Sequence, residues 1–250
     1  GMGGGTGTGA APVIARVAKE LGILTVAVVT TPFQFEGAGR MRIAQQGLKE
    51  LEGLVDTTIV VPNQNLMKVT DEKTTFLTAF AMADEVLHAG VRSITDLMVV
   101  PGLINLDFAD VRTIMNSMGR AMMGTGEAEG ENRAIEAVMG ALDSPLLNDN
   151  DITGAQQVLL KIVTGNGDDE IKMSELFKIK NKIQEAAGRN VNIIEGIGID
   201  PELGAAVSVT VVATGFEEKR KPKGTTIVGL DEEDVKVNDK IESSLSIEPV

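Results

Sequence analysis

Residues 1–29 read GMGGGTGTGAAPVIARVAKELGILTVAVV: a glycine-rich stretch, an amphipathic helix and an apolar strand, in that order. Pro12 stands where a first-turn proline belongs, and Gly22 stands where a helix-ending glycine belongs. The run from Ile23 to Val29 is almost continuously apolar and β-branched, which is the pattern of a parallel strand buried on both faces. The stretch therefore predicts an α/β fold in which glycines precede the start of a helix.

Downstream, apolar residues alternate between helical and strand spacing. A second helix is predicted to end near Gly53, a strand over 57–61 to end at Pro62, and a long helix to cover about 74–100. Short connections between these segments indicate a parallel sheet with helices packed on its faces. Further helices are predicted at 110–118, 131–142 and 174–187, with Ser174 as N-cap and Gly188 as stop, and further strands around 121–123 and at 158–163, 191–194 and 205–213.

Composition and charge exclude several classes of protein. The chain of 250 residues has a formal net charge of −13, which argues against a nucleic-acid partner or an anionic membrane surface. Any phosphate must therefore be held by backbone amides and a metal rather than by a basic patch. There is no cysteine and a single histidine, His88, which leaves no thiolate metal site and no Ser-His-Asp triad. No apolar run approaches the ~20 residues of a membrane span, so we expect a cytoplasmic protein without direct membrane insertion.

The glycine-rich stretch is compatible with more than one site. Glycines at the start of a helix let backbone N–H groups and the helix dipole converge on a phosphate. The stretch lacks the lysine of a Walker A loop. Residues 5–10 match a relaxed dinucleotide fingerprint, but the next strand ends in Thr30-Thr31-Pro32, without the acid that such a site needs for the ribose. A flexible tight turn is also compatible with these residues.

Residues 3–9, GGGTGTG, resemble the signature loop of the tubulin/FtsZ superfamily of GTPases. Three further segments fit the bacterial cell-division branch of that superfamily, in the expected order around the long helix: PFQFEGAGR at 32–40, Pro62-Asn63, and NLDFAD at 105–110. The resemblance covers about residues 1–215. It implies an α/β fold with a parallel Rossmann-like GTPase sheet that is incomplete at its N-terminus, a long central helix, and a second, smaller α/β domain with a mixed sheet.

The resemblance also implies a division of the chain. Residues 1–73 would be the C-terminal portion of the GTP-binding domain, 74–110 the central helix and catalytic loop, and 111–215 the second α/β domain. Residues 216–250 carry charge blocks with little apolar material, which predicts a disordered linker or tail. The strand–helix units that supply the other nucleotide loops would lie outside these residues, so we expect this piece alone to bind GTP poorly.

Binding of GTP or GDP is implied for residues in three segments. The phosphates would be cradled by backbone amides and hydroxyls of Gly4, Gly5, Thr6, Gly7 and Thr8. Glu36 would accept hydrogen bonds from the ribose hydroxyls, with Arg40 on the same face; a local i,i+4 ion pair is the alternative interpretation. Asn63 would reach the guanine, although a loop asparagine is also typical of a turn.

The long helix contributes the base-recognition residues that the resemblance implies. Asp84 would accept from the ring N–H and amino group of guanine, but Glu85 follows it, and the sequence leaves open which carboxylate faces the base. Phe80, one turn earlier, resembles the position that stacks on guanine, while its place in the apolar stripe also suits core packing. We assign His88 no role.

Asn105, Asp107 and Asp110 form the catalytic hypothesis. They lie past the far end of a helix ~39 Å long, too distant to reach the glycine-rich stretch of the same molecule. Two acids and an amide on one loop can orient water and help to bind the hydration shell of Mg²⁺. The resemblance implies head-to-tail self-assembly, in which the loop of one subunit completes the pocket of the next. The alternative is that Asn105 and Asp107 are turn residues and Asp110 caps the following helix.

The predicted function is that of a GTP-hydrolysing protein that polymerises head-to-tail at the mid-cell division site in the cytoplasm. Membrane anchors and regulators of the division ring would bind the tail, and no nucleic acid is expected as a partner. Two alternatives belong to other classes. One is a dinucleotide-binding oxidoreductase, which the missing ribose acid and the lack of a catalytic His or Tyr count against. The other is a filament or adaptor protein without catalysis.

Overall fold

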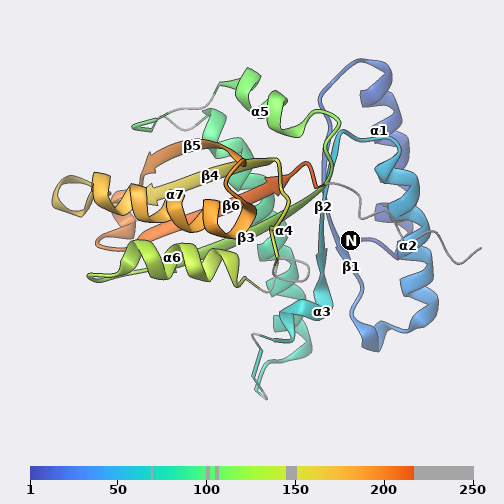
Figure 1. The fold of residues 1–250 in the computed structure, drawn as a ribbon. Helices are drawn as coiled ribbons and strands as arrows, with labels where there is room; N and C mark the ends of the chain where they lie inside the picture. The colour runs from blue at the N-terminus through green and yellow to red at the C-terminus, as the bar shows by residue number, and fades with distance from the viewer. Residues whose placement is uncertain (69, 72, 100–101, 105–106, 145–150, 217–250) are drawn as a thin grey trace, which may run out of the picture. The chain divides into compact units, whose positions relative to one another are not determined.

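The computed structural model describes residues 1–216 except 69, 72, 100–101, 105–106 and 145–150 (Figure 1). Residues 1–217 form one compact unit. The predicted tail lies outside the described residues apart from Phe216, and the predicted division at residues 73, 110 and 215 stays a prediction.

Within the described part of the chain, strands and helices alternate much as the sequence predicts. The strands are β1 (Val26–Thr31), β2 (Thr57–Pro62), β3 (Gly119–Ala128), β4 (Gln157–Thr164), β5 (Asn192–Ile199) and β6 (Val207–Thr214). The helices are α1 (Ala11–Glu20), α2 (Ala38–Glu52), α3 (Asn63–Leu66), α4 (Phe76–Val99), α5 (Phe108–Met115), α6 (Arg133–Leu142) and α7 (Met173–Ala187).

One six-stranded sheet with the order β1-β2-β3-β6-β4-β5 joins both halves of the unit. The pairs β1–β2, β2–β3 and β4–β5 are parallel, whereas β6 is antiparallel to both β3 and β4. Strand β3 makes the join, because its first residues pair with β2 and the remainder pairs with β6. The predicted α/β class, with a parallel part and a mixed part, is confirmed; the two parts share a sheet.

The helices cover the two faces of this sheet in separate groups. Ile59 pairs with Ala121, and both side chains belong to the core under α4 and α5. The opposite face carries α6 and α7 over β4, β5 and β6, and α1 and α2 over β1. Helix α4 contacts both β1 and β5, the two edge strands, so it crosses the whole width of the sheet (Figure 1).

Four details differ from the sequence predictions. Helical geometry starts at a π-helical turn, Thr6–Ala10, that runs directly into α1. The first strand begins at Val26 rather than at Ile23, because Thr25 is held by Asp56: its N–H donates to the carboxylate, and its carbonyl accepts from the Asp56 N–H, both at 2.9 Å. The short helix α3 was not predicted.

The fourth difference concerns the start of α7. Ser174 is not its N-cap. Lys172 holds that position, and the Glu175 carboxylate accepts from the Lys172 N–H at 2.8 Å. At the other end, Gly188 ends the helix with a φ of 116°, as predicted.

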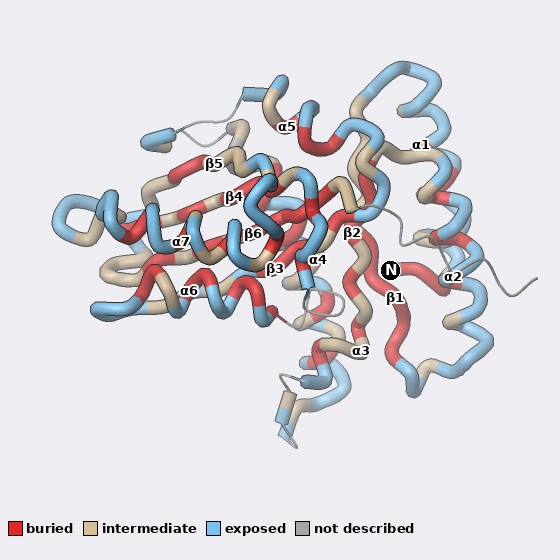
Figure 2. Tube along the Cα trace, in the orientation of Figure 1, coloured by how far each residue is buried: buried red, intermediate tan, exposed pale blue. Residues whose placement is uncertain are grey.

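Helix α1 turns its apolar residues outward. Val13, Ile14, Val17 and Leu21 are all more than half exposed, while the helix buries Pro12 and Ala15 (Figure 2). None of the described helices combines the length and apolar character that a membrane span requires.

Candidate functional site

The predicted nucleotide residues gather at one edge of the sheet. Strands β1 and β2 are parallel, so their carboxyl ends meet at the same edge, where open α/β sheets present ligand contacts. The segment after β1 carries Glu36 and the segment after β2 begins with Asn63. The Gln34 N–H donates to the Gln64 Oε1 at 3.0 Å and ties the two segments together.

The glycine-rich stretch lies against the same edge. The Met2 N–H donates to the Thr30 carbonyl at 2.9 Å, so the chain start follows the end of β1. Gly3 has a φ of 97°, and a Cβ built on it would lie 2.9 Å from Pro32 and 3.0 Å from Arg40. Only glycine fits at this position, because both the backbone conformation and the space exclude a side chain.

The helix start beside these glycines suits an anion. Gly5 is the N-cap of the π-helical turn and offers no side-chain cap. The first amide N–H groups of a helix have no intrahelical partner, and they stand at the positive end of its dipole. Gly5 and Thr6 are exposed, so a phosphate can reach them. The backbone N–H groups at this helix start are therefore the candidate ligands for an anion in a chain whose net charge is −13.

Thr8 stabilises the conformation of the glycine-rich stretch. Its hydroxyl accepts a hydrogen bond from the Gly3 N–H at 2.8 Å. A Cβ built on Gly47 of α2 would clash with the Thr8 methyl group, which shows how closely the turn packs on that helix. A similar Cβ on Gly7 would collide with the Gly1 carbonyl. Thr8 and Gly7 thus hold the shape of the stretch, while Gly5 and Thr6 form its exposed part.

Glu36 and Arg40 form the ion pair that the sequence left as an alternative. Arg40 Nη1 lies 3.0 Å from Glu36 Oε2, and the other carboxylate oxygen accepts from the Phe33 N–H at 2.8 Å. The Glu36 side chain is only 10% exposed, whereas Arg40 is half exposed. Gly4 also lies beside Arg40, whose guanidinium would be 3.9 Å from a Cβ built on it. The pair therefore connects the glycine-rich stretch with the start of α2.

Asn63 carries an unusual buried atom. The residue is 6% exposed, and its Oδ1 has no hydrogen-bond partner among the described residues. A buried acceptor without a partner costs about 1–3 kcal/mol, so such groups need a reason. A ligand with an N–H donor, such as a purine base, would satisfy this oxygen.

Phe80 belongs to an aromatic cluster that the sequence analysis missed. Its ring lies 4.8 Å from that of Phe76 and 5.3 Å from that of Phe33, and Phe33 stacks on Phe35 at 4.9 Å. The signal was available, because four of the seven phenylalanines lie in the two segments that meet here. Phe35 and Phe76 are more than half exposed, so the cluster offers aromatic faces to a planar ligand.

The structure distinguishes the surroundings of Asp84 from those of Glu85. Asp84 is exposed one turn after Phe80, and residues four apart share a helix face. Glu85 instead lines a cleft on the other side of α4, where its carboxylate lies 3.9 Å from His88 Nδ1. Asp84 is therefore the carboxylate on the side of the aromatic cluster.

The acidic loop lies at the opposite end of α4. Asp107 is the N-cap of α5 and accepts from the Asp110 N–H at 2.9 Å; Asp110 Oδ2 accepts from the Asp107 N–H at 3.3 Å. Capping thus falls mainly on Asp107 rather than on Asp110 alone. Asn105 lies outside the described residues. Because α4 has 24 residues, about 36 Å at 1.5 Å each, the acids are not brought to the glycine-rich stretch.

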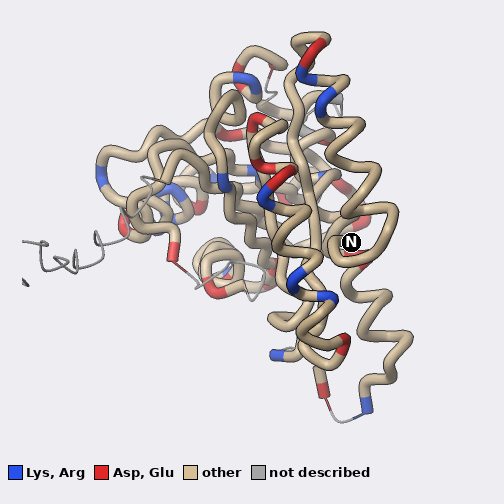
Figure 3. The backbone as a smooth tube through the Cα atoms, turned by 90° about the vertical axis from the view of Figure 1, so that its right-hand side faces the viewer, with Lys and Arg blue, Asp and Glu red and all other residues tan. Residues whose placement is uncertain are grey.

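Charge is mixed over this part of the surface. Over α1 and α2, which face the viewer in Figure 3, basic and acidic residues are interspersed. No group of three or more His, Cys, Asp or Glu side chains that could hold a metal occurs in the described part of the chain. These residues therefore do not build a protein-ligated metal centre.

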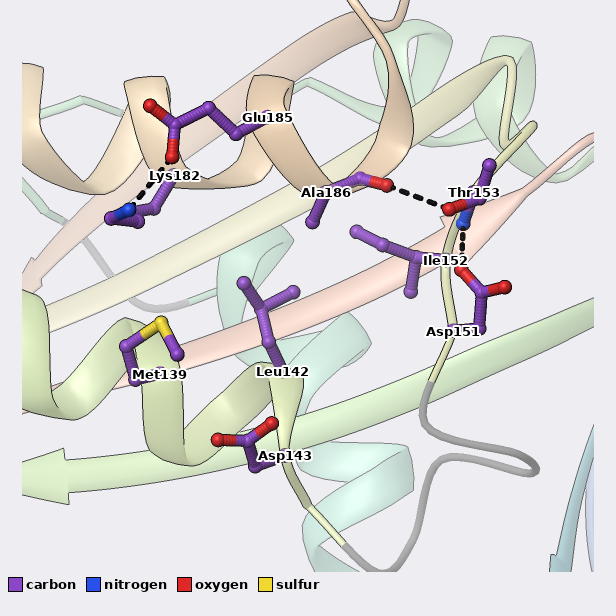
Figure 4. Close-up of a pocket in the computed structure, with 9 residues that line it drawn as sticks. All are labelled: Met139, Leu142, Asp143, Asp151, Ile152, Thr153, Lys182, Glu185 and Ala186. Carbon is purple, nitrogen blue, oxygen red and sulfur yellow. Dashed lines mark hydrogen bonds and ion pairs between the residues drawn. The ribbon is translucent and has the colours of Figure 1, made fainter.

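A cavity elsewhere in the molecule lacks an arrangement of polar groups like that of the candidate site beside β1 and β2. It encloses about 390 Å³ between α6 and α7 (Figure 4). Its polar groups bond to one another: Lys182 with Glu185 at 2.7 Å, and the Thr153 hydroxyl with the Ala186 carbonyl at 3.1 Å. We assign this cavity no function.

Comparison with known proteins places this geometry in a class. The model of the tubulin/FtsZ family GTPase domain matches residues 1–71, and the model of the FtsZ family C-terminal domain matches residues 119–217. An FtsZ dimer from M. jannaschii is similar in structure, with a TM-score of 0.79 and 43% identity over 86% of this chain and 61% of that one. CetZ1 from Haloferax volcanii shares the fold, with a TM-score of 0.68 and 20% identity. The protein is therefore a tubulin-like α/β protein.

Within that class, the chain belongs to the FtsZ family. It is 56% identical to the cell division protein FtsZ of Rickettsia conorii over 223 residues, which are 89% of this chain and 49% of the relative. It is also 56% identical to the cell division protein FtsZ of Caulobacter vibrioides over 217 residues, 87% of this chain and 42% of the relative. The chain thus spans about half the length of the curated relatives it matches. The resemblance inferred from the motifs is confirmed.

Proposed function

We propose that this chain is part of a GTPase that polymerises head-to-tail and takes part in bacterial cell division. The matched family model is that of a GTPase domain, and the relatives are cell division proteins. The bound ligand would be GTP or GDP. The site of action would be the cytoplasm at mid-cell, with membrane anchors and regulators of the division ring bound through the tail.

Nucleotide binding would use the edge of the sheet beside β1 and β2. The backbone amides of Gly4, Gly5, Thr6 and Gly7, of which Gly5 and Thr6 are exposed, would hold the phosphates, with the Thr8 hydroxyl fixing the turn. Glu36, held by Arg40, would accept from the ribose hydroxyls. The Asn63 Oδ1 would accept from the base, and its lack of a partner among the described residues supports this assignment.

The rest of base recognition would come from α4. Asp84 would accept from the ring N–H and the amino group of guanine, a donor pair that adenine does not offer. Phe80 would stack on the base from within its aromatic cluster. Glu85 is the poorer candidate, because it lines the cleft on the other side of the helix.

Hydrolysis would take place between subunits. Asp107 and Asp110, with Asn105, would orient and polarise the water that attacks the γ-phosphate, and loop amides would stabilise the developing charge. Mg²⁺ would neutralise phosphate charge when bound. It would be held through the phosphate oxygens and its own waters, since the described residues gather no metal-binding cluster.

The observation that carries this proposal is the separation of the two halves of the site along α4. Asp107 is exposed beyond one end, and Asn63 and Phe80 lie toward the other. Because the exposed rings of Phe35 and Phe76 lie at one end and the exposed Asp107 lies beyond the other, a second subunit placed end to end would bring the two halves together. A contact of this kind does not close on itself and builds an open filament.

The proposal is tested on the whole protein that contains this chain. GTP turnover per subunit should rise with protein concentration, because the site forms only in the polymer, and sedimentation should show polymers with GTP. Stabilisation by NAD but not GTP in a thermal-shift panel of GTP, ATP and NAD would point to an oxidoreductase instead. Polymers without turnover would point to a filament protein without catalysis.

A further inference from the structure

A cleft of about 630 Å³ separates α4 from strands β4, β5 and β6. Two oppositely charged side chains meet across it: Asp96 near the end of α4 and Lys161 in the middle of β4. Lys161 Nζ lies 3.1 Å from Asp96 Oδ2, and Arg92 Nε lies 3.3 Å from the same oxygen. The cleft therefore contains a link between the central helix and the mixed part of the sheet.

This ion pair is shielded from water. The Asp96 and Lys161 side chains are 18% and 15% exposed, whereas both partners of the Arg16–Glu50 pair are 56% exposed. Exposed pairs are screened and contribute little, while shielded pairs interact in a lower effective dielectric. Arg92 is itself mostly exposed and approaches from the same helix, so Lys161 is the partner that crosses the cleft.

The pair stands next to the attachment of the acidic loop. Lys161 is in register with Gly196 of β5, and the next residue along β5 is Ile197. The Leu103 N–H donates to the Ile197 carbonyl at 2.8 Å, and the Ile197 N–H donates to the Ile104 carbonyl at 3.0 Å. The chain that leaves α4 is thus bonded to the sheet one residue from the position opposite Lys161.

Gly102 shows how closely this chain segment approaches the strand. A Cβ built on Gly102 would clash with the Ile197 carbonyl. The backbone hydrogen bonds between Ile104 and Ile197 therefore require the segment to lie directly against β5. A tilt of the end of α4 away from β4 would break these hydrogen bonds. The Asp96–Lys161 ion pair and the backbone hydrogen bonds to Ile197 together hold the start of the loop that leads to Asp107.

We propose that Asp96 and Lys161 are positioning residues for hydrolysis. They hold the end of α4 against β4, so that the segment at Leu103–Ile104 stays on β5 and Asp107 and Asp110 are presented in one orientation to the neighbouring subunit. In this role neither residue would contact the nucleotide or the attacking water. This inference rests on the proposed function for its catalytic consequence, whereas its structural part stands on the contacts alone.

The test uses the whole protein with the substitutions Asp96→Asn and Lys161→Gln. Hydrogen exchange of the Leu103 and Ile104 amides should become at least tenfold faster in each variant, while exchange in β1 and β2 is unchanged. GTP affinity should be unchanged, because the pocket lies at the other end of α4, and the maximal turnover should fall about tenfold. The double variant Asp96→Lys, Lys161→Asp should restore both the exchange protection and the turnover.

The control is Arg16→Gln, which removes an exposed ion pair and should leave the exchange of Leu103 and Ile104 unchanged. Unaltered exchange in folded Asp96→Asn and Lys161→Gln variants would overturn the proposal. Faster exchange with full turnover would overturn its catalytic part. If the unmodified protein hydrolyses no GTP, the proposed function fails, while the exchange experiment still decides whether the pair holds the loop.

Discussion

Asp107 combines two requirements in a single carboxylate. It caps α5 through the Asp110 N–H, and it stands exposed where the proposed mechanism needs an acid. Asparagine is as good an N-cap as aspartate, but it cannot act as a charged base. The two roles of this residue can therefore be separated by the choice of substitution.

We predict that Asp107→Asn leaves the thermal stability unchanged and lowers maximal GTP turnover by at least a hundredfold. Asp107→Ala should lower turnover equally and also cost about 1 kcal/mol, because the cap is lost. Denaturant unfolding and steady-state turnover of the whole protein measure both effects. Full activity of a stable Asp107→Asn protein would show that the carboxylate is only a cap.

At Asn63 we expect one substitution to raise the stability of the protein and to weaken nucleotide binding. Its buried Oδ1 lacks a partner, so we predict that Asn63→Leu raises the free energy of unfolding by about 1 kcal/mol in the absence of nucleotide. The same change should weaken GTP binding at least tenfold. Urea unfolding and a GTP titration test this pair of effects, and Asn65→Leu in the same short helix is the control. Loss of stability in Asn63→Leu would contradict the account of this residue.

The ion pair between Arg133 and Glu175 predicts that the free energy of unfolding depends on pH. The guanidinium makes two hydrogen bonds to the carboxylate, at 2.8 and 3.0 Å, and both residues are buried. The hydrogen bond from Arg133 is the main cause that lowers the pKa of Glu175, and the same bond is the main cause that raises the pKa of Arg133. Because the pKa of Glu175 is lowered in the folded protein, the ionised carboxylate contributes fully to the free energy of unfolding above the ordinary pKa of a glutamate. This contribution is lost as the pH falls through the pKa that Glu175 has in the folded protein.

We predict that Glu175→Gln lowers the free energy of unfolding at pH 7 by about 3 kcal/mol, because Arg133 keeps its charge without its partner. The difference from the unmodified protein should shrink as the pH falls from the ordinary pKa of a glutamate through the lowered pKa of Glu175, where the unmodified carboxylate also becomes protonated. Urea unfolding from pH 3 to pH 7 measures both. A difference that stays constant with pH would show that the ion pair does not set the acid limit of stability.

At the scale of elements, β3 and α6 show how closely backbone can pack. A Cβ on Gly126 of β3 would clash with the backbone of α6 at Ala137 and Ala141. We predict that Gly126→Ala destabilises the protein by about 3 kcal/mol, because neither element can move without disturbing the core. Gly53→Ala is the control and should be neutral, because Gly53 has a φ of −75° and a Cβ built on it would lie at an ordinary contact distance of 3.6 Å from the Glu50 carbonyl oxygen. Equal unfolding midpoints for the two variants would contradict this packing.

The sequence predicted the elements with the clearest periodicity and missed those set by tertiary contact. The long helix was predicted over 74–100 and spans Phe76–Val99, because its apolar steps of three and four are uninterrupted. Strand β3 was predicted as a fragment around 121–123 and spans Gly119–Ala128. Its glycines interrupt the strand pattern, and the reason for Gly126 becomes visible only in the structure, where α6 lies directly on it.

In the candidate site, too, some features were predicted from the sequence and others were not. The motifs predicted that Glu36, Arg40 and Asn63 lie near the glycine-rich stretch, and the structure brings them to one edge of the sheet. The aromatic cluster around Phe80 was missed although its phenylalanines are concentrated in two segments, and the Asn63 Oδ1 without a partner could not be predicted, since it depends on contacts between distant segments. The outward apolar face of α1 was likewise invisible, because periodicity shows that a helix has an apolar face but not what covers it.

At the scale of the whole molecule, the central claim is that a working site needs two subunits. The pocket residues and the acidic loop lie at opposite ends of α4, which contacts both edge strands of the sheet. A single subunit would therefore hold a nucleotide without the acids that act on it. This arrangement would couple hydrolysis to assembly, because only a subunit within a filament would meet the loop of its neighbour.

The most direct measurement mixes two inactive variants of the whole protein. One carries Glu36→Gln and Asn63→Leu in the pocket, and the other carries Asp107→Asn and Asp110→Asn in the loop. In a random head-to-tail copolymer, about one quarter of the junctions pair an intact pocket with an intact loop. The account predicts that the equal mixture regains about that fraction of the unmodified turnover; a copolymer no more active than its separate components would contradict it.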